Sequence, residues 1–358
     1  MIGAGATSVV HRGESVATGR PVALKVIHRE LCGNKQIFGR YQREAKILER
    51  LRGPNIVEFL DFIVHGELLV IALELVDGAP LDRVLRTPLD LGLAVEVTIQ
   101  IAEGLAAAHR AGVIHRDLKP ANVVVEPRGW PGAGSGAPRV RILDFGLAKV
   151  IHGEHMTTGL TEHDMIFGTP EYMSPEQARG DDLDGRSDVY SAGVILYEMA
   201  TGAVPFAGRT PLATMTAHLT EPLVRAREVA PARAISATLD TVIARALSKE
   251  PAERYESAEA FMQALRAVSE RRLAGRAGAE SRIATTEMEL GETDLAVRLS
   301  QVPIERKQAI EGRATSGISG PPPGISVAPS EVGGRWWIVV GILVAGAAIA
   351  AGVYFAFR

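Results

Sequence analysis

The sequence predicts an α+β protein with two unequal lobes, a small β-rich lobe followed by a larger helical lobe. Two observations support this prediction: short strand-like apolar runs fill the chain up to about residue 75, and apolar residues recur at helical spacing after Gly78. A third observation, about 22 uncharged residues near the C-terminus, adds one transmembrane helix. We therefore divide the chain into a globular unit (1–268), a disordered juxtamembrane linker (269–335) and a membrane span (336–357).

The globular unit begins with strands that surround one helix. Strand composition marks four runs, at residues 8–12, 21–26, 56–64 and 68–75. Between them, residues 38–51 carry apolar side chains at helical spacing. Residues 91–111 form the first long helix, and the chain stays mainly helical beyond Asp188. The junction of two such lobes is a natural place for a ligand cleft.

The C-terminal run contains Trp336 at its start and Tyr354 near its end, where an aromatic belt would lie. As a helix it would be about 33 Å long, enough to cross a hydrocarbon core. A buried core helix is the alternative, which we disfavour because soluble helices rarely stay uncharged for so long. Arg335, on the N-terminal side, favours a cytoplasmic globular unit. Small residues at Gly341, Ala345 and Gly346 offer packing spots for a homodimer. The linker mixes balanced charges with Ala, Gly, Ser and Pro, which favours disorder.

Composition excludes some classes of function. The net charge of −3 provides no basic field, so nucleic acid is not an expected partner. Cys32 is the only cysteine, which excludes an internal disulfide and a cysteine-based zinc site.

The N-terminus carries a glycine-rich pattern. Gly3, Gly5, Ser8 and Val10 fit G-x-G-x-x-G-x-V, with Ser8 in the place of the third glycine. Glycines let the backbone approach phosphate oxygens closely, with amide N–H groups as donors. Taken alone, the pattern is better explained as an ordinary Gly/Ala-rich stretch, and its value comes from its spacing to the motifs that follow.

A lysine and a glutamate follow at a suggestive distance. Lys25 lies within the strand-like run VALKV, and Glu44 lies on the predicted helix. Each alone would be read as a solvated surface residue. Together they can form an ion pair that holds the lysine against the α- and β-phosphates of a nucleotide.

The strongest motif is HRDLKPAN, from His115 to Asn122. Asp144-Phe145-Gly146 comes 22 residues later, after an apolar strand. With these motifs in this order, residues 1–268 resemble the eukaryotic-like Ser/Thr protein kinases of bacteria, here with a C-terminal membrane anchor. The resemblance implies the bilobal protein kinase fold, ATP as cosubstrate, and Mg²⁺ or Mn²⁺ as the metal.

The resemblance assigns roles to the motif residues. Asp117 would accept or orient the proton of the substrate hydroxyl, and Lys119 would neutralise the transferring phosphoryl group. Asn122 and Asp144 would hold the metal through oxygen atoms. Ser/Thr kinases carry a lysine two residues after the catalytic aspartate, as Lys119 does here, and a threonine at the motif position of Thr169. The expected acceptors are therefore Ser and Thr residues of proteins.

The resemblance also places the nucleotide and two structural supports. The Glu74 carbonyl and the Val76 amide would bond the adenine edge, and the ring would lie among Val10, Ala23 and Val124. Glu176 would pair with Arg254, and Asp188 would hold the backbone of the catalytic loop.

Regulation and localisation follow as expectations. Arg116 immediately precedes Asp117 and favours an activation loop that brings it a phosphate, with Thr161 as first choice for an autophosphorylated residue. Because ATP is cytosolic, the kinase unit should lie on the cytoplasmic side of the inner membrane.

The chain starts two residues before Gly3, so the first strand of the small lobe is expected to be cut short. This favours an alternative from another class, a membrane-tethered pseudokinase scaffold. Against it stands the presence of all five motif residues: Lys25, Glu44, Asp117, Asn122 and Asp144.

Overall fold

The computed structural model describes residues 1–4, 8–28, 48–65, 68–86, 88–126, 138–145 and 169–280. The first lobe is an antiparallel sheet in the order β1-β2-β3-β5-β4. Its strands are β1 (Gly3–Ala4), β2 (Ser8–Glu14), β3 (Pro21–Ile27), β4 (Phe59–His65) and β5 (Leu68–Glu74).

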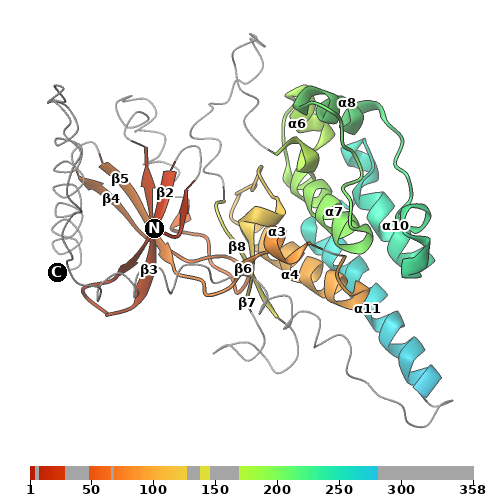
Figure 1. Ribbon diagram of the computed structural model, residues 1–358, viewed down its shortest axis with the longest axis horizontal. Coiled ribbons are helices and arrows are strands. Elements are labelled where there is room, and N and C mark those ends of the chain that lie inside the picture. Colours follow the sequence, from red (N-terminus) through yellow and green to blue (C-terminus); the bar gives the residue numbers. More distant parts are fainter. Residues whose placement is uncertain are drawn as a thin grey trace, which may run out of the picture.

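The second lobe is helical, apart from a small antiparallel sheet in the order β6-β7-β8 at the junction of the lobes. Its strands are β6 (Ala79–Pro80), β7 (Val123–Glu126) and β8 (Arg139–Ile142). Its α-helices are α3 (Leu81–Val84), α4 (Leu91–Arg110), α6 (Pro175–Arg179), α7 (Gly185–Thr201), α8 (Pro211–Thr220), α9 (Ala226–Val229), α10 (Ala237–Ala246) and α11 (Ala258–Glu280). Short 3-10 turns lie at η1 (Pro120–Asn122), η2 (Pro170–Tyr172), η3 (Pro231–Arg233) and η4 (Pro251–Glu253). Figure 1 shows the two lobes side by side, with β6, β7 and β8 between the larger sheet and the helices. The predicted bilobal α+β architecture is confirmed.

Strand β3 shows how the first sheet is built. Successive side chains of a strand point to opposite faces. Val22 and Leu24 pack with Val70 and Ala72 of β5 in a small apolar cluster on one face. Ala23 and Lys25 therefore lie on the opposite face, which is also largely buried.

One predicted strand starts later than expected. The run 56–64 becomes a strand only from Phe59, because the backbone before it pairs elsewhere: Ile56 bridges Ile142, and the Val57 N–H donates to the Ile142 carbonyl at 3.0 Å. Strand β1 has two residues and pairs Gly3 with Val10 and Ala4 with Val9. The predicted helix over 38–51 lies outside the described residues up to residue 47.

The helical lobe is organised around α4. This helix is capped by Asp90, whose carboxylate accepts from the Gly92 and Leu93 amides at 2.8 and 3.1 Å. It packs against α7, α11 and β8, and its apolar residues lie in the main core. Among the described helices, α4 alone has the length and apolar character of a membrane span, yet most of it is buried inside the lobe. The predicted span 336–357 lies outside the described residues.

Helix α11 closes the lobe and continues to Glu280, twelve residues beyond the predicted end of the globular unit. Its Arg272 meets the capping carboxylate of Asp90 at 3.0 Å, which ties the last helix to the start of α4.

Candidate active site

Lys25 is held on the inner face of β3, opposite Val10 of β2 and Ile71 of β5. Its amine forms an ion pair with Asp144, at 2.7 Å between Nζ and Oδ1. Asp144 follows the end of β8 by two residues. The contact therefore joins the first lobe to the junction sheet.

Asp144 is restrained in two ways. Its φ of 58° is in the left-handed region, which costs a non-glycine residue on the order of 1–3 kcal/mol and is typical of functional sites. Burial opposes ionisation of its carboxylate, but Lys25 outweighs burial and holds the pKa of Asp144 below its usual value. The group is therefore a carboxylate anion near neutral pH.

The catalytic loop brings three predicted residues together. Lys119 Nζ lies 2.8 Å from Asp117 Oδ2. The Asn122 amide nitrogen donates to the Asp117 carbonyl at 2.8 Å and to Asp117 Oδ2 at 3.2 Å. These bonds fix the Asp117 carboxylate and leave the Asn122 side-chain oxygen without a hydrogen bond to any described residue.

The loop is linked to Asp144 through the backbone of the junction sheet. Val123 pairs with Ile142, and the Leu143 N–H donates to the Asn122 carbonyl at 2.8 Å. His115 strengthens the link, because its Nε2 contacts the Leu143 carbonyl at 2.8 Å and its ring lies 4.8 Å from that of Phe145. The two charged pairs, Lys25–Asp144 and Lys119–Asp117, therefore belong to one site.

Asp188 of α7 holds the start of the catalytic loop. Its carboxylate accepts from the His115 amide at 2.8 Å and from the Arg116 amide at 3.0 Å. These bonds confirm the predicted support, and they stabilise the left-handed φ of 67° at Arg116. Burial opposes ionisation, but the hydrogen bond from His109 outweighs it and lowers the pKa of Asp188.

The apolar residues expected around the adenine ring lie on three different strands. Val10 of β2, Ala23 of β3 and Val124 of β7 come from three strands, and Ala23 and Val124 are buried. Gly78 lies close to β7: a Cβ at this position would meet the Val125 carbonyl oxygen at 2.6 Å. The connection between the lobes therefore needs a glycine where it passes β7.

The predicted hinge begins at the end of β5. The Glu74 side chain forms an ion pair with Arg141 of β8, and it also accepts from the Glu58 amide at 3.3 Å. Beside them lies Glu126, which is buried, and burial raises its pKa. The start of the hinge is thus held by Arg141 of β8 through the Glu74 side chain.

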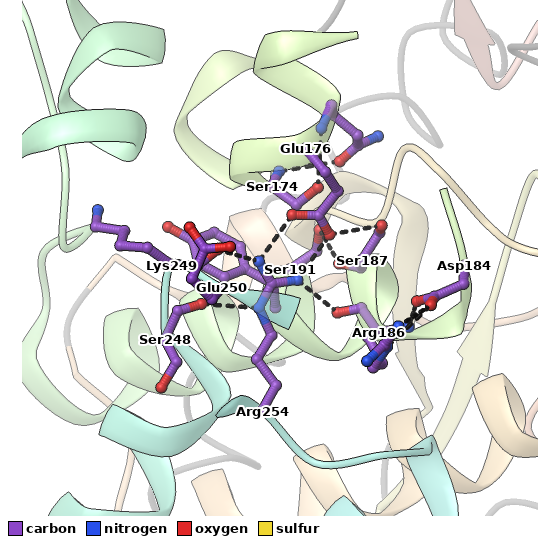
Figure 2. A network of polar contacts seen from close by, with 12 residues as sticks. Ser174, Glu176, Asp184, Arg186, Ser187, Ser191, Ser248, Lys249, Glu250 and Arg254 are labelled. Carbon is purple, nitrogen blue, oxygen red and sulfur yellow. Dashed lines mark hydrogen bonds and ion pairs between the residues drawn. The ribbon is translucent and has the colours of Figure 1, made fainter. Parts of the chain in front are cut away.

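The segment from Thr169 to Arg179 contains Glu176, one half of the predicted Glu176–Arg254 pair. Figure 2 shows Arg254 at the centre of its polar network. Its two terminal nitrogens meet the two Glu176 oxygens at 2.6 and 2.7 Å, which confirms the predicted pair. Arg254 also donates to the carbonyls of Arg186, Ser248 and Lys249.

Helix α6 connects this network to the catalytic loop. Ser174 and Gln177 form a capping box at the start of the helix. The Gln177 amide nitrogen also donates to the Arg116 carbonyl at 2.6 Å. A displacement of α6 would therefore move the backbone beside Asp117.

Three predicted site residues, Gly5, Glu44 and Thr161, lie outside the described residues. Gly3 and Ser8 lie on β1 and β2, with Ser8 buried. Val76 follows β5, and nothing in the described part of the chain tests its role.

Sequence reasoning missed three residues that support the site: His109, Arg141 and Gln177. His109 Nε2 lies 2.7 Å from Asp188 Oδ2, although 79 residues separate the two along the chain. A signal was available for Arg141, because a charged residue inside the apolar run VRIL requires a partner if the strand is buried. For His109, in the last turn of α4, and Gln177, in the short helix α6, we find no local signal.

Comparison with known proteins agrees with this geometry. The protein kinase domain family matches residues 1–265. Serine/threonine-protein kinase pkn3 of Myxococcus xanthus is 43% identical over 278 residues, which cover 76% of this chain and 49% of that protein. Serine/threonine-protein kinase PkaA of Streptomyces coelicolor is 40% identical over 282 residues, covering 75% of this chain and 49% of that protein. The chain thus spans about half the length of these relatives.

Solved structures show the same fold. The kinase domain of Mycobacterium tuberculosis PknI has a TM-score of 0.56 at 28% identity, over 74% of this chain and 93% of that domain. Rad53 1–466 in complex with AMP-PNP has 24% identity and a TM-score of 0.58, and the match covers 73% of this chain and 62% of that solved chain. At this identity it shows the fold alone. On the family match and the geometry together, this chain belongs to the protein kinase family.

Proposed function

We propose that the chain is a Ser/Thr protein kinase that transfers the γ-phosphoryl group of ATP to Ser and Thr hydroxyls of proteins. One observation carries the proposal: two ion pairs, Lys25–Asp144 and Lys119–Asp117, converge on one site through the junction sheet. The bacterial relatives, named as serine/threonine-protein kinases, favour the same conclusion.

The residues fit a divalent metal. Mg²⁺ binds through one or two protein oxygens together with phosphate oxygens. Asp144 provides an ionised carboxylate, and the Asn122 oxygen is available because its amide nitrogen is bonded to Asp117. These two residues would hold Mg²⁺, or Mn²⁺ in its place, and the bound ion would neutralise charge on the phosphates.

The protein groups then have distinct tasks. Lys25 would exchange its contact with Asp144 for the α- and β-phosphates of ATP. Asp117, fixed by Asn122, would orient the substrate hydroxyl and take its proton as the oxygen attacks the γ-phosphorus and ADP leaves. Lys119, 2.8 Å from Asp117, would stabilise negative charge on the transferring group.

The test is transfer of the labelled γ-phosphate of ATP to a protein acceptor, with the Asp117→Asn variant beside the wild type. We expect the variant to lose at least about 100-fold in rate, the usual effect of removing a positioned base. Phosphoamino acid analysis should find phosphoserine and phosphothreonine. Equal labelling by both proteins would contradict the mechanism, and nucleotide binding without any transfer would favour the pseudokinase scaffold.

We further propose that the kinase autophosphorylates at Thr161 and that the phosphate binds Arg116. The support is that no carboxylate in the described part of the chain forms an ion pair with the Arg116 guanidinium. Mass spectrometry should find phosphate on Thr161, and Thr161→Ala should lower activity while Thr157→Ala, on the same loop, should not. Full activity of unphosphorylated protein would rule this out.

The apolar run at 336–357 supports a further proposal, that the protein is a single-pass protein of the inner membrane with its kinase unit in the cytoplasm and that its spans associate as a homodimer. Full-length protein should sediment with membranes, and a chain ending at residue 335 should stay in the supernatant. Leucine at Gly341 and Gly346 should abolish cross-linking between two copies if these glycines pack at the dimer interface. Equal distribution of the two chains would refute anchoring.

A further inference from the structure

Two distant side chains hold the backbone of Arg116, the residue before the expected catalytic base. Its amide donates to Asp188 of α7 at 3.0 Å, and its carbonyl accepts from Gln177 of α6 at 2.6 Å. In the described part of the chain, no other group donates to this carbonyl. The carbonyl belongs to the same rigid peptide plane as the Asp117 amide. Gln177 therefore sets the orientation of the plane from which Asp117 projects.

Arg116 needs both bonds because its backbone is strained. Its φ of 67° is in the left-handed region, which is unfavourable for a residue other than glycine. Asp188 fixes the peptide plane before Arg116, and Gln177 fixes the plane after it. Together the two bonds define the φ and ψ of this residue. Without the second bond the strained residue would be free to relax, and Asp117 would move with it.

The Gln177 side chain is used at both ends. Its Oε1 accepts from the Ser174 amide at 3.0 Å, while its Nε2 donates to the Arg116 carbonyl. The reverse orientation would place N–H against N–H and oxygen against oxygen, so the partners fix the amide. The capping box requires only the acceptor, which a glutamate supplies as well and with a charge that suits a helix N-terminus. The helix cap therefore does not explain the amide, whereas the bond to Arg116 does.

Helix α6 is a firm base for this side chain. Glu176, the neighbour of Gln177 in the chain, is buried and its carboxylate is bonded to Arg254 and Ser187 (Figure 2). Ser174, at the N-cap, is also buried. Gln177 thus extends from a fixed part of the helical lobe to the catalytic loop.

We propose that Gln177 is a positioning residue for phosphoryl transfer, a role that rests on the kinase function proposed above. Its amide N–H holds the Arg116 carbonyl and thereby keeps the Asp117 carboxylate directed at the substrate hydroxyl. Gln177 is not among the residues assigned to ATP or the metal. Its loss should therefore lower kcat and leave nucleotide binding nearly unchanged, because a small displacement of a catalytic group is costly for the rate.

Gln177→Glu is the matched variant for this role. It keeps the length of the side chain and the acceptor for the Ser174 amide, but it places an oxygen against the Arg116 carbonyl. Steady-state transfer of the labelled γ-phosphate to a protein acceptor, with the full chain, should show kcat at least about tenfold lower and KM for ATP within about twofold of the wild type. An unchanged kcat would overturn the proposal, and so would a loss that lies entirely in KM for ATP.

Gln177→Lys makes the opposite exchange. Its ammonium group can donate to the Arg116 carbonyl but cannot accept from the Ser174 amide, and a positive charge is unfavourable at this end of a helix. The lysine variant should therefore unfold at a lower urea concentration than Gln177→Glu and yet keep the higher kcat. If Gln177 served the helix alone, kcat would follow stability and the lysine variant would be the slower enzyme. That order would overturn the proposal.

Wild type and Asp117→Asn are assayed beside these variants to separate the two proposals. Equal labelling by wild type and Asp117→Asn would refute the kinase function, and the role of Gln177 would fall with it. A clear loss in Asp117→Asn together with full activity of Gln177→Glu would refute the role of Gln177 alone.

Discussion

Lys25 and Arg254 are both buried cations that face a carboxylate, but the two pairs are built differently. Lys25 Nζ contacts Asp144, whose side chain is 33% exposed. Arg254 has a fully buried side chain and contacts both Glu176 oxygens and three backbone carbonyls. Ser187 donates to the same Glu176 carboxylate at 2.7 Å.

This difference indicates two uses of charge. Among the described residues, the Lys25–Asp144 pair has few other partners, so phosphates and a metal can replace each half without leaving many of these bonds unmade. The Glu176–Arg254 pair is bonded on nearly every side, and a missing half would leave a buried charge uncompensated. The first pair suits exchange during turnover, and the second suits a permanent support.

The largest effect is expected from breaking the Glu176–Arg254 pair, which we call the permanent pair. Arg254→Met should lower the free energy of unfolding by about 3–5 kcal/mol, because Glu176 and three carbonyls lose their partner in the interior. Urea denaturation measures it. The double variant Glu176→Leu/Arg254→Met should recover part of the loss, since it removes both charges. A loss below about 1 kcal/mol in the single variant would show that the pair is not the support described here.

Lys25→Met should show the opposite profile. We expect at least about a 100-fold loss of phosphoryl transfer, because the lysine positions the phosphates, with a change in unfolding free energy of only about 1 kcal/mol. Transfer assays and denaturation on the same sample measure both. A large loss of stability with Lys25→Met would erase the contrast between the two pairs.

Acid should weaken the permanent pair in a predictable direction. Burial opposes ionisation of Glu176, but Arg254 outweighs it and lowers the pKa of Glu176 below the usual 4.5. The native state therefore gains stability from this carboxylate above that value and loses it as the pH falls through the lowered pKa. Unfolding free energy should decline below about pH 5, and less steeply in Glu176→Gln.

Glu198 serves as a control, because its pKa is shifted in the opposite direction to that of Glu176. Burial raises its pKa, against a hydrogen bond from Tyr172. Its contribution is therefore present at low pH and is lost as the pH rises through the raised pKa, so Glu198→Gln should make the rise of stability with pH steeper above about 4.5. The same change of slope in both variants would contradict these assignments.

The smallest effect is expected for an exposed pair next to the permanent one. Arg186 contacts Asp184 at 2.6 Å, and both side chains are partly in solvent. Arg186→Ala should cost less than about 1 kcal/mol, because solvent screens the pair and the Arg186 carbonyl still accepts from Arg254. Denaturation under the conditions used for Arg254→Met gives a direct comparison, and equal losses would show that burial does not decide the difference.

The sequence predicted those parts of the site whose residues lie within one short segment of the chain. His115 to Asn122 form one loop, so their spacing alone places Asp117 near Asn122. Lys25 was identified together with Glu44, its expected ion-pair partner nineteen residues later, and its contact with Asp144 became visible only in the folded chain. The start of β4 was misplaced because the Val57 amide bonds to Ile142, a contact across the lobes.

The sequence by itself determined the order of the two lobes, the family resemblance and the identity of the motif residues, because these depend on local periodicity and on fixed spacing. Only the tertiary structure decided three further polar contacts: Arg141 with Glu74, His109 with Asp188, and Gln177 with the backbone of the catalytic loop. Each of these contacts joins elements that are more than 60 residues apart in the chain. The need of a buried polar group for a partner is local, but which partner it finds depends on how the elements pack.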